Sequence, residues 1–91
     1  MGHPRFSSAE IMRRGKQLYE ERIRDLVETD ENIGKQIVID IETGEYDIDE
    51  DGALASIRLM RQHPGAALYG ARVGYDAVYS LGGTLTRTTR K

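Results

Sequence analysis

The chain has 91 residues with a formal net charge of −2, and 38% of them are hydrophobic and 31% charged. This length accommodates one domain with a single modest core, and the composition excludes an intrinsically disordered chain. Cysteine is absent, which excludes disulfides and thiolate metal sites and fits a reducing cytoplasm, and no apolar run of about 18 residues indicates a membrane span or an export signal.

The small net charge conceals an asymmetry along the chain. Residues 1–24 carry six basic and three acidic groups, a net of +3, and residues 53–91 carry six basic groups and one acidic group, a net of +5. Residues 25–52 carry one lysine and eleven acidic groups, a net of −10. Basic ends around an acidic middle favour docking between unlike surfaces, including self-association, and argue against a single nucleic-acid-binding face.

The first predicted element is an amphipathic helix over about residues 8–28. Ser7 and Glu10 match a capping box, in which the serine hydroxyl accepts a hydrogen bond from the backbone N–H of Glu10. Apolar residues then recur at spacings of three, four and seven, and Gly15 among them weakens the helix by about 1 kcal/mol relative to alanine. Full burial stabilises each apolar side chain by roughly 1.5–3 kcal/mol, so the helix is expected to pack on the rest of the domain or on another copy of itself. The association surface predicted on this helix consists of Ile11, Leu18, Tyr19, Ile23 and Leu26.

Residues 36–48 are predicted to form a β-hairpin. Ile37, Ile39 and Ile41 alternate with other residues and share one face, which favours a strand with a buried side. The segment ETGE supplies the turn, and the apolar alternation continues beyond it on a returning strand. The acidic side chains of the hairpin are expected on its opposite, solvated face: Asp40, Glu42, Glu45 and Asp47.

Residues 47–52 read DIDEDG and match the first half of a calcium-binding EF-hand loop. The match fails further on, because the position that needs a bidentate glutamate is Arg58 and position 9 is Ala55, which has no side-chain oxygen. The acidic residues are better interpreted as the start of a helix over residues 50–62, with Asp49 as its N-cap. The apolar face expected for this helix consists of Leu54, Ile57, Met60 and, as a further candidate, Leu59.

The end of the chain predicts a second hairpin. The helix is expected to stop at the sequence HPG, and residues 66–81 then alternate as two strands around a glycine turn. Residues 84–91 read TLTRTTRK and are predicted to form a mobile basic tail. The fold class predicted for residues 1–91 is therefore one α+β domain. It has a long N-terminal amphipathic helix, a hairpin, a helix and a hairpin, with a mostly antiparallel four-stranded sheet.

Two stretches of the chain resemble a group of small uncharacterised bacterial proteins that is common in cyanobacteria. The stretches are GKQIVIDIETGEYDIDED and HPGAALYGARVGYDAVYSLGG, and the shared pattern covers about residues 10–83. It consists of a hairpin with a TGEY turn, a helix and an ending of the type RVGYxAVY. Some members are encoded beside small retropepsin-like aspartic proteases or resemble antitoxins. The resemblance therefore implies this fold and an antitoxin-like partner role, and it implies no catalytic residues.

The reactive side chains do not predict an enzyme. The two histidines, His3 and His63, lack the spacing of a zinc site, and the glycines follow no phosphate-loop pattern. We therefore predict no catalytic residue, no metal and no cofactor. The favoured function is a non-enzymatic cytoplasmic interaction module, either a homo-oligomer or the small partner of another protein.

The alternative function is nucleic-acid binding by the first helix and the tail, because basic residues gather in both. No RNP or helix-turn-helix pattern supports this alternative, and the acidic middle of the chain opposes it. The residues that would contact phosphates are Arg13, Arg14, Lys16, Arg87 and Arg90.

Overall fold

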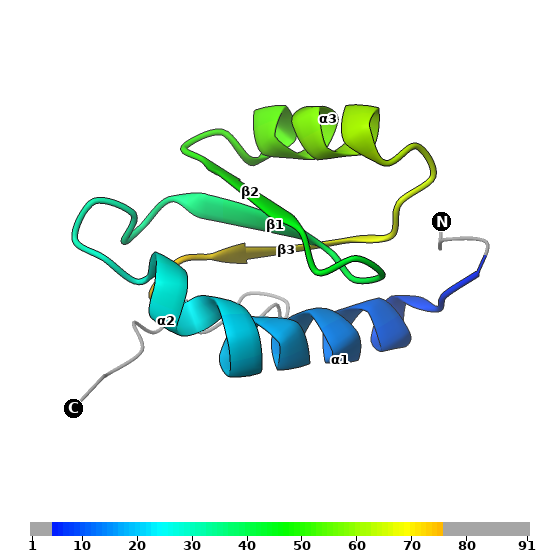
Figure 1. Cartoon of the computed structure of the whole chain (residues 1–91), viewed down its shortest axis with the longest axis horizontal. Coiled ribbons are helices and arrows are strands. Elements are labelled where there is room, and N and C mark those ends of the chain that lie inside the picture. The colour runs from blue at the N-terminus through cyan, green and yellow to red at the C-terminus, as the bar shows by residue number, and fades with distance from the viewer. Residues whose placement is uncertain (1–4, 76–91) are drawn as a thin grey trace, which may run out of the picture.

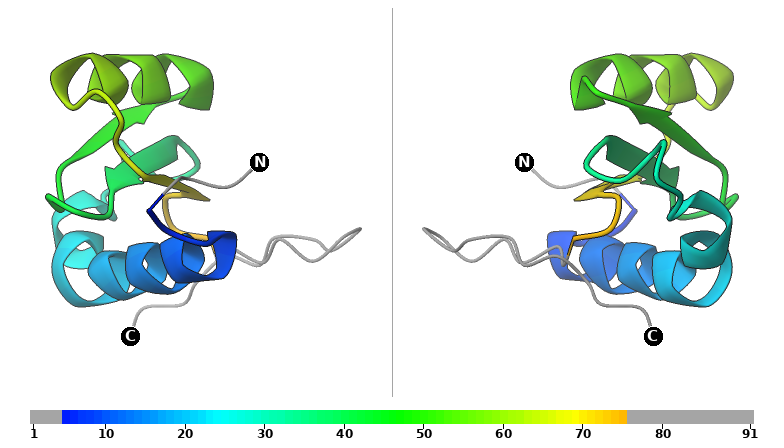
Figure 2. Two further views of the ribbon diagram at one scale, coloured as in Figure 1. Left: turned by 90° about the vertical axis from the view of Figure 1, so that its right-hand side faces the viewer. Right: turned by 90° about the vertical axis from the view of Figure 1, so that its left-hand side faces the viewer.

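The computed structural model describes residues 5–75, which form three layers, with a sheet between two helical segments (Figures 1 and 2). This arrangement confirms the α+β class and the long N-terminal helix. No helix within the described residues is long and apolar enough to cross a membrane. The elements in chain order are α1 (Ser8–Leu18), η1 (Tyr19–Ile23), α2 (Arg24–Val27), β1 (Gln36–Asp40), β2 (Tyr46–Asp49), α3 (Gly52–Gln62) and β3 (Leu68–Arg72).

The sheet has the order β2-β1-β3, and both pairings are antiparallel. The predicted first hairpin is confirmed, since β1 and β2 pair with Ile37 opposite Ile48. The predicted second hairpin over residues 66–81 is described only in its first strand, β3, which pairs with β1. Its second strand, and the tail predicted at 84–91, lie outside the described residues. The described residues thus hold three strands, and the predicted fourth strand is not among them.

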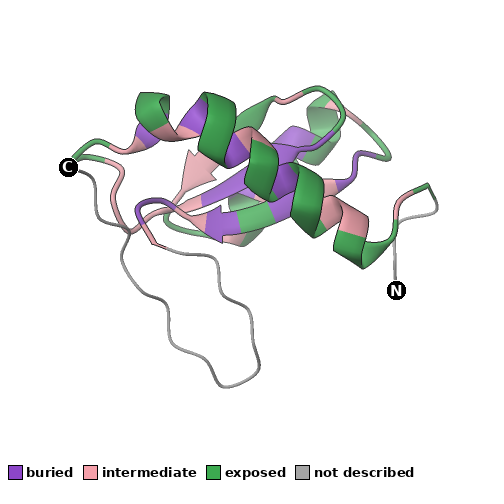
Figure 3. Cartoon of the chain, turned by 90° about the horizontal axis from the view of Figure 1, so that it is seen from below, coloured by how far each residue is buried: buried purple, intermediate pink, exposed green. Residues whose placement is uncertain are grey.

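The larger core lies between the sheet and the N-terminal helical segment. Ile37 and Ile39 on β1 are fully buried there, and Tyr69 on β3 is 5% exposed. Figure 3, seen from the side of α1, shows buried positions recurring along the helix where it lies over the strands. The predicted buried face of the first strand is thus confirmed, and the first helix packs against the sheet of its own chain.

The opposite face of the sheet is buried where α3 covers it, so the prediction of a solvated acidic face is wrong for Asp40. Glu42 and Glu45 are exposed as predicted, and Asp47 is half-buried. Val38 packs with Ala55 and Leu59 of α3, and Asp40 is only 2% exposed. The Oδ1 atom of Asp40 accepts a hydrogen bond from the backbone N–H of Glu42 at 2.9 Å. β1 is the central strand with helices on both faces, which explains its near-continuous apolar sequence.

The N-terminal helical segment contains a wide turn that the sequence analysis did not predict. In η1 the backbone N–H of Arg24 donates to the carbonyl of Tyr19, five residues earlier, as in a π-helix. The buried residues follow a strict four-residue spacing. On an α-helix, each step of four residues would turn the buried side by about 40° around the helix axis. The wide turn offsets this rotation, so the same side of the segment stays on the sheet. The buried residues in this series are Gly15, Tyr19, Ile23 and Val27.

Candidate interaction surfaces

The outer face of α3 carries three of the four side chains that the sequence assigns to its apolar face. Leu54 and Ile57 are each 48% exposed and Met60 is 40% exposed, whereas Ala55 and Leu59 pack on the sheet. The buried face combines Leu59 with the small residues Gly52 and Ala55, which let the helix lie close to the sheet. A Cβ built on Gly52, for example, would collide with the side chain of Gln36 on β1. Leu54, Ile57 and Met60 therefore form an exposed apolar stripe along α3, while Leu59 is buried against the sheet.

The two ends of α3 carry opposite charges. Glu50 and Asp51 lie exposed at its N-terminal end, and Arg61 lies exposed in its last turn. Within residues 5–75, the guanidinium of Arg61 has no hydrogen-bond or ion-pair partner. The apolar stripe thus runs between an acidic end and an available cation.

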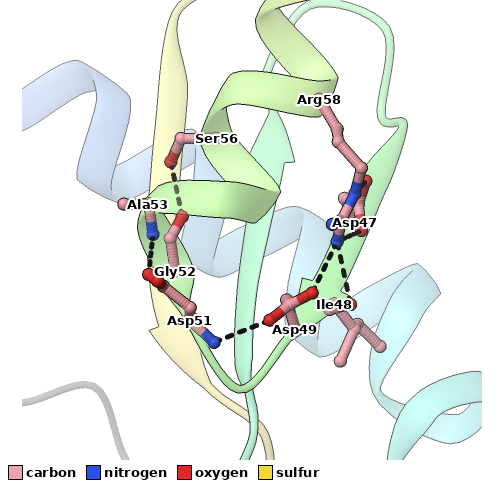
Figure 4. A network of polar contacts seen from close by, with 8 residues as sticks. All are labelled: Asp47, Ile48, Asp49, Asp51, Gly52, Ala53, Ser56 and Arg58. Carbon is pink, nitrogen blue, oxygen red and sulfur yellow. Dashed lines mark hydrogen bonds and ion pairs between the residues drawn. The ribbon is translucent and has the colours of Figure 1, made fainter.

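The DIDEDG loop is held by Arg58 and by its own turns (Figure 4). Arg58 donates two hydrogen bonds to the carboxylate of Asp47, at 2.8 and 2.7 Å, and one to Asp49 at 3.0 Å. The N-cap of α3 is Asp51, whose Oδ1 accepts from the backbone N–H of Ala53, so the prediction of Asp49 as N-cap is wrong. Asp49 instead accepts from the backbone N–H of Asp51 and turns the chain into a helix that begins at residue 52.

These hydrogen bonds engage the carboxylates of the segment that matches the first half of a calcium-binding loop. The guanidinium of Arg58 stands where the loop would need its closing glutamate. Hydrogen bonds from Arg58 lower the pKa of Asp47, and those from Asp51 and Arg58 lower the pKa of Asp49. Among the described residues, no three histidine or carboxylate groups gather to hold a metal ion. The acidic loop therefore serves to pin α3 onto β2.

Replacing Arg58 with glutamine should raise the pKa of Asp47 toward its ordinary value of 3.8, because its strongest hydrogen-bond donor is lost. The depressed pKa stabilises the fold above pH 3.8, and that stabilisation disappears as pH falls. The stability difference between the wild type and Arg58→Gln should therefore shrink on acidification. Carboxyl-carbon NMR titration measures the pKa, with Arg61→Gln as the control on the same helix. An unchanged pKa of Asp47 in Arg58→Gln would contradict the assignment.

A second ion pair joins the end of α3 to the β1–β2 turn. His63 is the C-cap of α3, as its predicted place at the helix end requires, and its Nε2 lies 2.8 Å from Oε1 of Glu45. The hydrogen bond to Glu45, opposed by a smaller burial effect, raises the pKa of His63 above 6.5. The folded state therefore favours the protonated imidazole.

The His63 pair predicts a pH-dependent stability. Because the pKa is raised in the folded state, the stabilisation is complete below pH 6.5 and is lost as pH rises through the raised pKa. The melting temperature of the wild type should therefore decrease as pH rises above 6.5. In Glu45→Gln this contribution to the decrease should be absent. Circular dichroism measures the melting temperature of both proteins. The variant Glu42→Gln serves as the control in the same turn. Equal pH profiles for wild type and Glu45→Gln would show that the pair contributes nothing.

The association surface predicted on the first helix is mostly used within the chain. Tyr19 and Ile23 are 5% and 3% exposed in the core, so they cannot serve as contact residues for a partner. Ile11 and Leu18 are half-buried against the same core. Leu26 alone of these five is well exposed, at 68%. Four of the five residues therefore pack against the sheet of their own chain rather than against a partner.

A buried polar network ties the helical segment to the turn after β3. The hydroxyl of Tyr19 donates to Oε2 of Glu28 at 2.7 Å and accepts from the backbone N–H of Gly74 at 3.3 Å. Arg24 donates to the same Oε2 at 3.0 Å and to Glu20 at 2.6 Å. Burial and the hydrogen bond to Glu28 raise the pKa of Tyr19. Among residues 5–75, every buried side-chain nitrogen or oxygen atom has a hydrogen-bond partner, and this includes the atoms of this network.

The basic residues of the alternative function are only partly described. Arg13 and Arg14 lie exposed on α1 near Glu10, at 3.9 and 3.2 Å, and Arg14 also stacks over Phe6. Lys16 is exposed on the same helix, whereas positions 87 and 90 lie outside the described residues. Beside the two arginines the surface is hollowed, and sequence reasoning missed this hollow because Ile41 reaches it from the β1–β2 turn.

No family model, no curated protein and no solved structure matches this chain. The resemblance to the small bacterial proteins therefore stays a prediction.

Proposed function

We propose that this chain is a non-enzymatic interaction module that pairs with a second copy of itself through the outer face of α3. The observation that supports this proposal is the stripe of Leu54, Ile57 and Met60, each at least 40% exposed. Large apolar side chains gathered on one face are a mark of protein interaction sites. We therefore expect self-association through this face of α3 instead of through the first helix.

The arrangement of charges favours an antiparallel pair of α3 helices. A two-fold axis at Ile57 places Leu54 of one copy against Met60 of the other, so the apolar stripe covers itself. It also places Arg61 of each copy level with Ala53 of the other, within reach of the exposed Glu50. The acidic end and the available cation of one helix thus meet their opposites in the second copy.

Substituting Ile57 with glutamate should abolish the pairing, because it brings two carboxylates together at the two-fold axis in an apolar contact. We expect the wild type to show concentration-dependent dimers in sedimentation velocity, since one short helix pair buries less area than a standard interface. Ile57→Glu should stay monomeric at the same concentrations. Leu26→Glu is the matched control, because Leu26 is exposed on a different element and should leave the dimer intact.

A charge exchange tests the orientation of the pair. Arg61→Glu should weaken the dimer about tenfold, and adding Glu50→Arg in the same chain should restore it, since both copies then carry the reversed pair. A wild-type chain that is monomeric at all concentrations would refute the proposal. Dimers that survive Ile57→Glu would place the interface elsewhere.

A further inference from the structure

The hollow beside α1 combines a cationic rim with an apolar floor. It has a volume of about 350 Å³ and lies between the helical segment and the residue that follows β1. Leu18 and Ile41 contribute the apolar side chains, and Arg13, Arg14 and Arg22 contribute the cations. This volume lies at the lower end of the range for ligand sites in proteins.

Two of the cations that line the hollow are regularly spaced along the helical segment. Arg14, Leu18 and Arg22 follow one another at four-residue intervals along one row of the helical segment. The row therefore reads cation, apolar side chain, cation, with the two arginines about 12 Å apart along the axis. Within residues 5–75, Arg22 has no hydrogen-bond or ion-pair partner.

We infer that this hollow binds an extended acidic peptide in which two acidic residues flank an apolar one, at alternate positions. In an extended chain, residues i, i+2 and i+4 point to one side and span about 13 Å. This length matches the distance between Arg14 and Arg22, and the central side chain falls over Leu18 and Ile41. Arginine also suits the task, because its guanidinium holds a carboxylate by two parallel hydrogen bonds.

The remaining residues of the hollow determine how positive the electrostatic potential is at each of its two ends. Glu21 lies beside Arg22 and accepts a hydrogen bond from Gln17 at 3.3 Å, so it reduces the positive potential there. Arg13 adds a second cation at the other end, where Glu10 pairs with Arg14 at 3.2 Å. We therefore expect the acidic residue near Arg13 and Arg14 to contribute more affinity than the one near Arg22.

The apolar floor distinguishes this site from a phosphate-binding surface. A nucleic-acid backbone places phosphates and sugars over the arginines and has no aliphatic side chain to cover Leu18 and Ile41. The half-buried Leu18 is already ordered by the core, which lowers the entropic cost of covering it. The observations thus favour an acidic protein segment over nucleic acid, and the site is independent of the pairing through α3.

The test is fluorescence anisotropy of a labelled peptide, Gly-Ser-Glu-Ser-Leu-Ser-Glu-Ser-Gly, titrated with the full chain. We expect saturable binding that weakens about tenfold in Arg14→Glu and less in Arg22→Glu. Lys16→Glu is the matched control, since Lys16 lies on the same helix and does not line the hollow. Replacing the central leucine of the peptide with serine should also weaken binding. Circular dichroism of each variant establishes that the helix is retained, and Arg14→Gln serves as a milder second variant.

Several outcomes would overturn the inference. Equal losses in Lys16→Glu and Arg14→Glu would indicate unspecific attraction to a basic helix. Equal binding of the leucine and serine peptides would show that the apolar floor plays no part. Tighter binding of a single-stranded oligonucleotide, lost in the same arginine variants, would assign the hollow to nucleic acid. An absence of peptide binding at low salt would end the proposal.

Discussion

Replacing Gly15 with alanine should destabilise the protein, although alanine is the better helix former. A Cβ at this position would lie inside the van der Waals contact distance of the Cβ and ring atoms of Tyr69, a buried residue of β3. Alanine gains about 1 kcal/mol from helix propensity, but the displaced ring costs more, so we expect a net loss of roughly 2 kcal/mol. Gly15→Val, which adds two more methyl groups at the same contact, should lose still more. Urea denaturation followed by circular dichroism measures both.

The control for this prediction is the glycine next to Tyr69. A Cβ on Gly70 would meet no atom within 4 Å. Gly70→Ala should therefore be neutral or stabilise the strand by about 0.5 kcal/mol. A stabilising effect of Gly15→Ala would mean that α1 does not approach the sheet as closely as described.

Replacing Glu28 with alanine should also cost several kcal/mol. The carboxylate side chain is 5% exposed and accepts from both Tyr19 and Arg24. Its removal leaves the buried hydroxyl of Tyr19 without an acceptor and Arg24 without its buried partner, for which we expect a loss of about 2–4 kcal/mol.

The matched control is Glu20, the exposed partner of the same arginine. Its side chain is 40% exposed, so Glu20→Ala should change the free energy of unfolding by at most about 1 kcal/mol. Urea denaturation of the two variants compares a buried with an exposed carboxylate on one guanidinium. Equal losses in the free energy of unfolding would show that the burial of Glu28 adds nothing to the stability that this carboxylate provides.

Much of the fold could be predicted because local signals agree with it. The Ser7 hydroxyl accepts from the backbone N–H of Glu10 at 3.1 Å, as the capping pattern predicts. The alternation of Ile37, Ile39 and Ile41 identified a buried face. Turn residues and periodicity indicated the hairpin of β1 and β2. These are short-range features, which the sequence carries directly.

What could not be predicted depends on contacts between distant residues. The pairing of β1 with β3 makes β1 the central strand, so its second face needed a cover that α3 provides. The side of α3 that faces the sheet carries Ala55 and Leu59, and of these two only Leu59 is part of the apolar face predicted from the sequence. The wide turn at 19–23 does have a signal in the sequence. The four-residue spacing of the buried positions is too regular for an unbroken α-helix.

The sheet that separates the two helical layers also separates the two proposed surfaces. α3 covers one face, while the segment that holds Arg14 and Arg22 covers the other (Figure 2). A pair joined back to back through α3 would therefore present its two hollows outward, on opposite sides of the assembly. A ligand with two acidic segments on a linker long enough to span them would bind bivalently, and its avidity would depend on that linker rather than on any new contact.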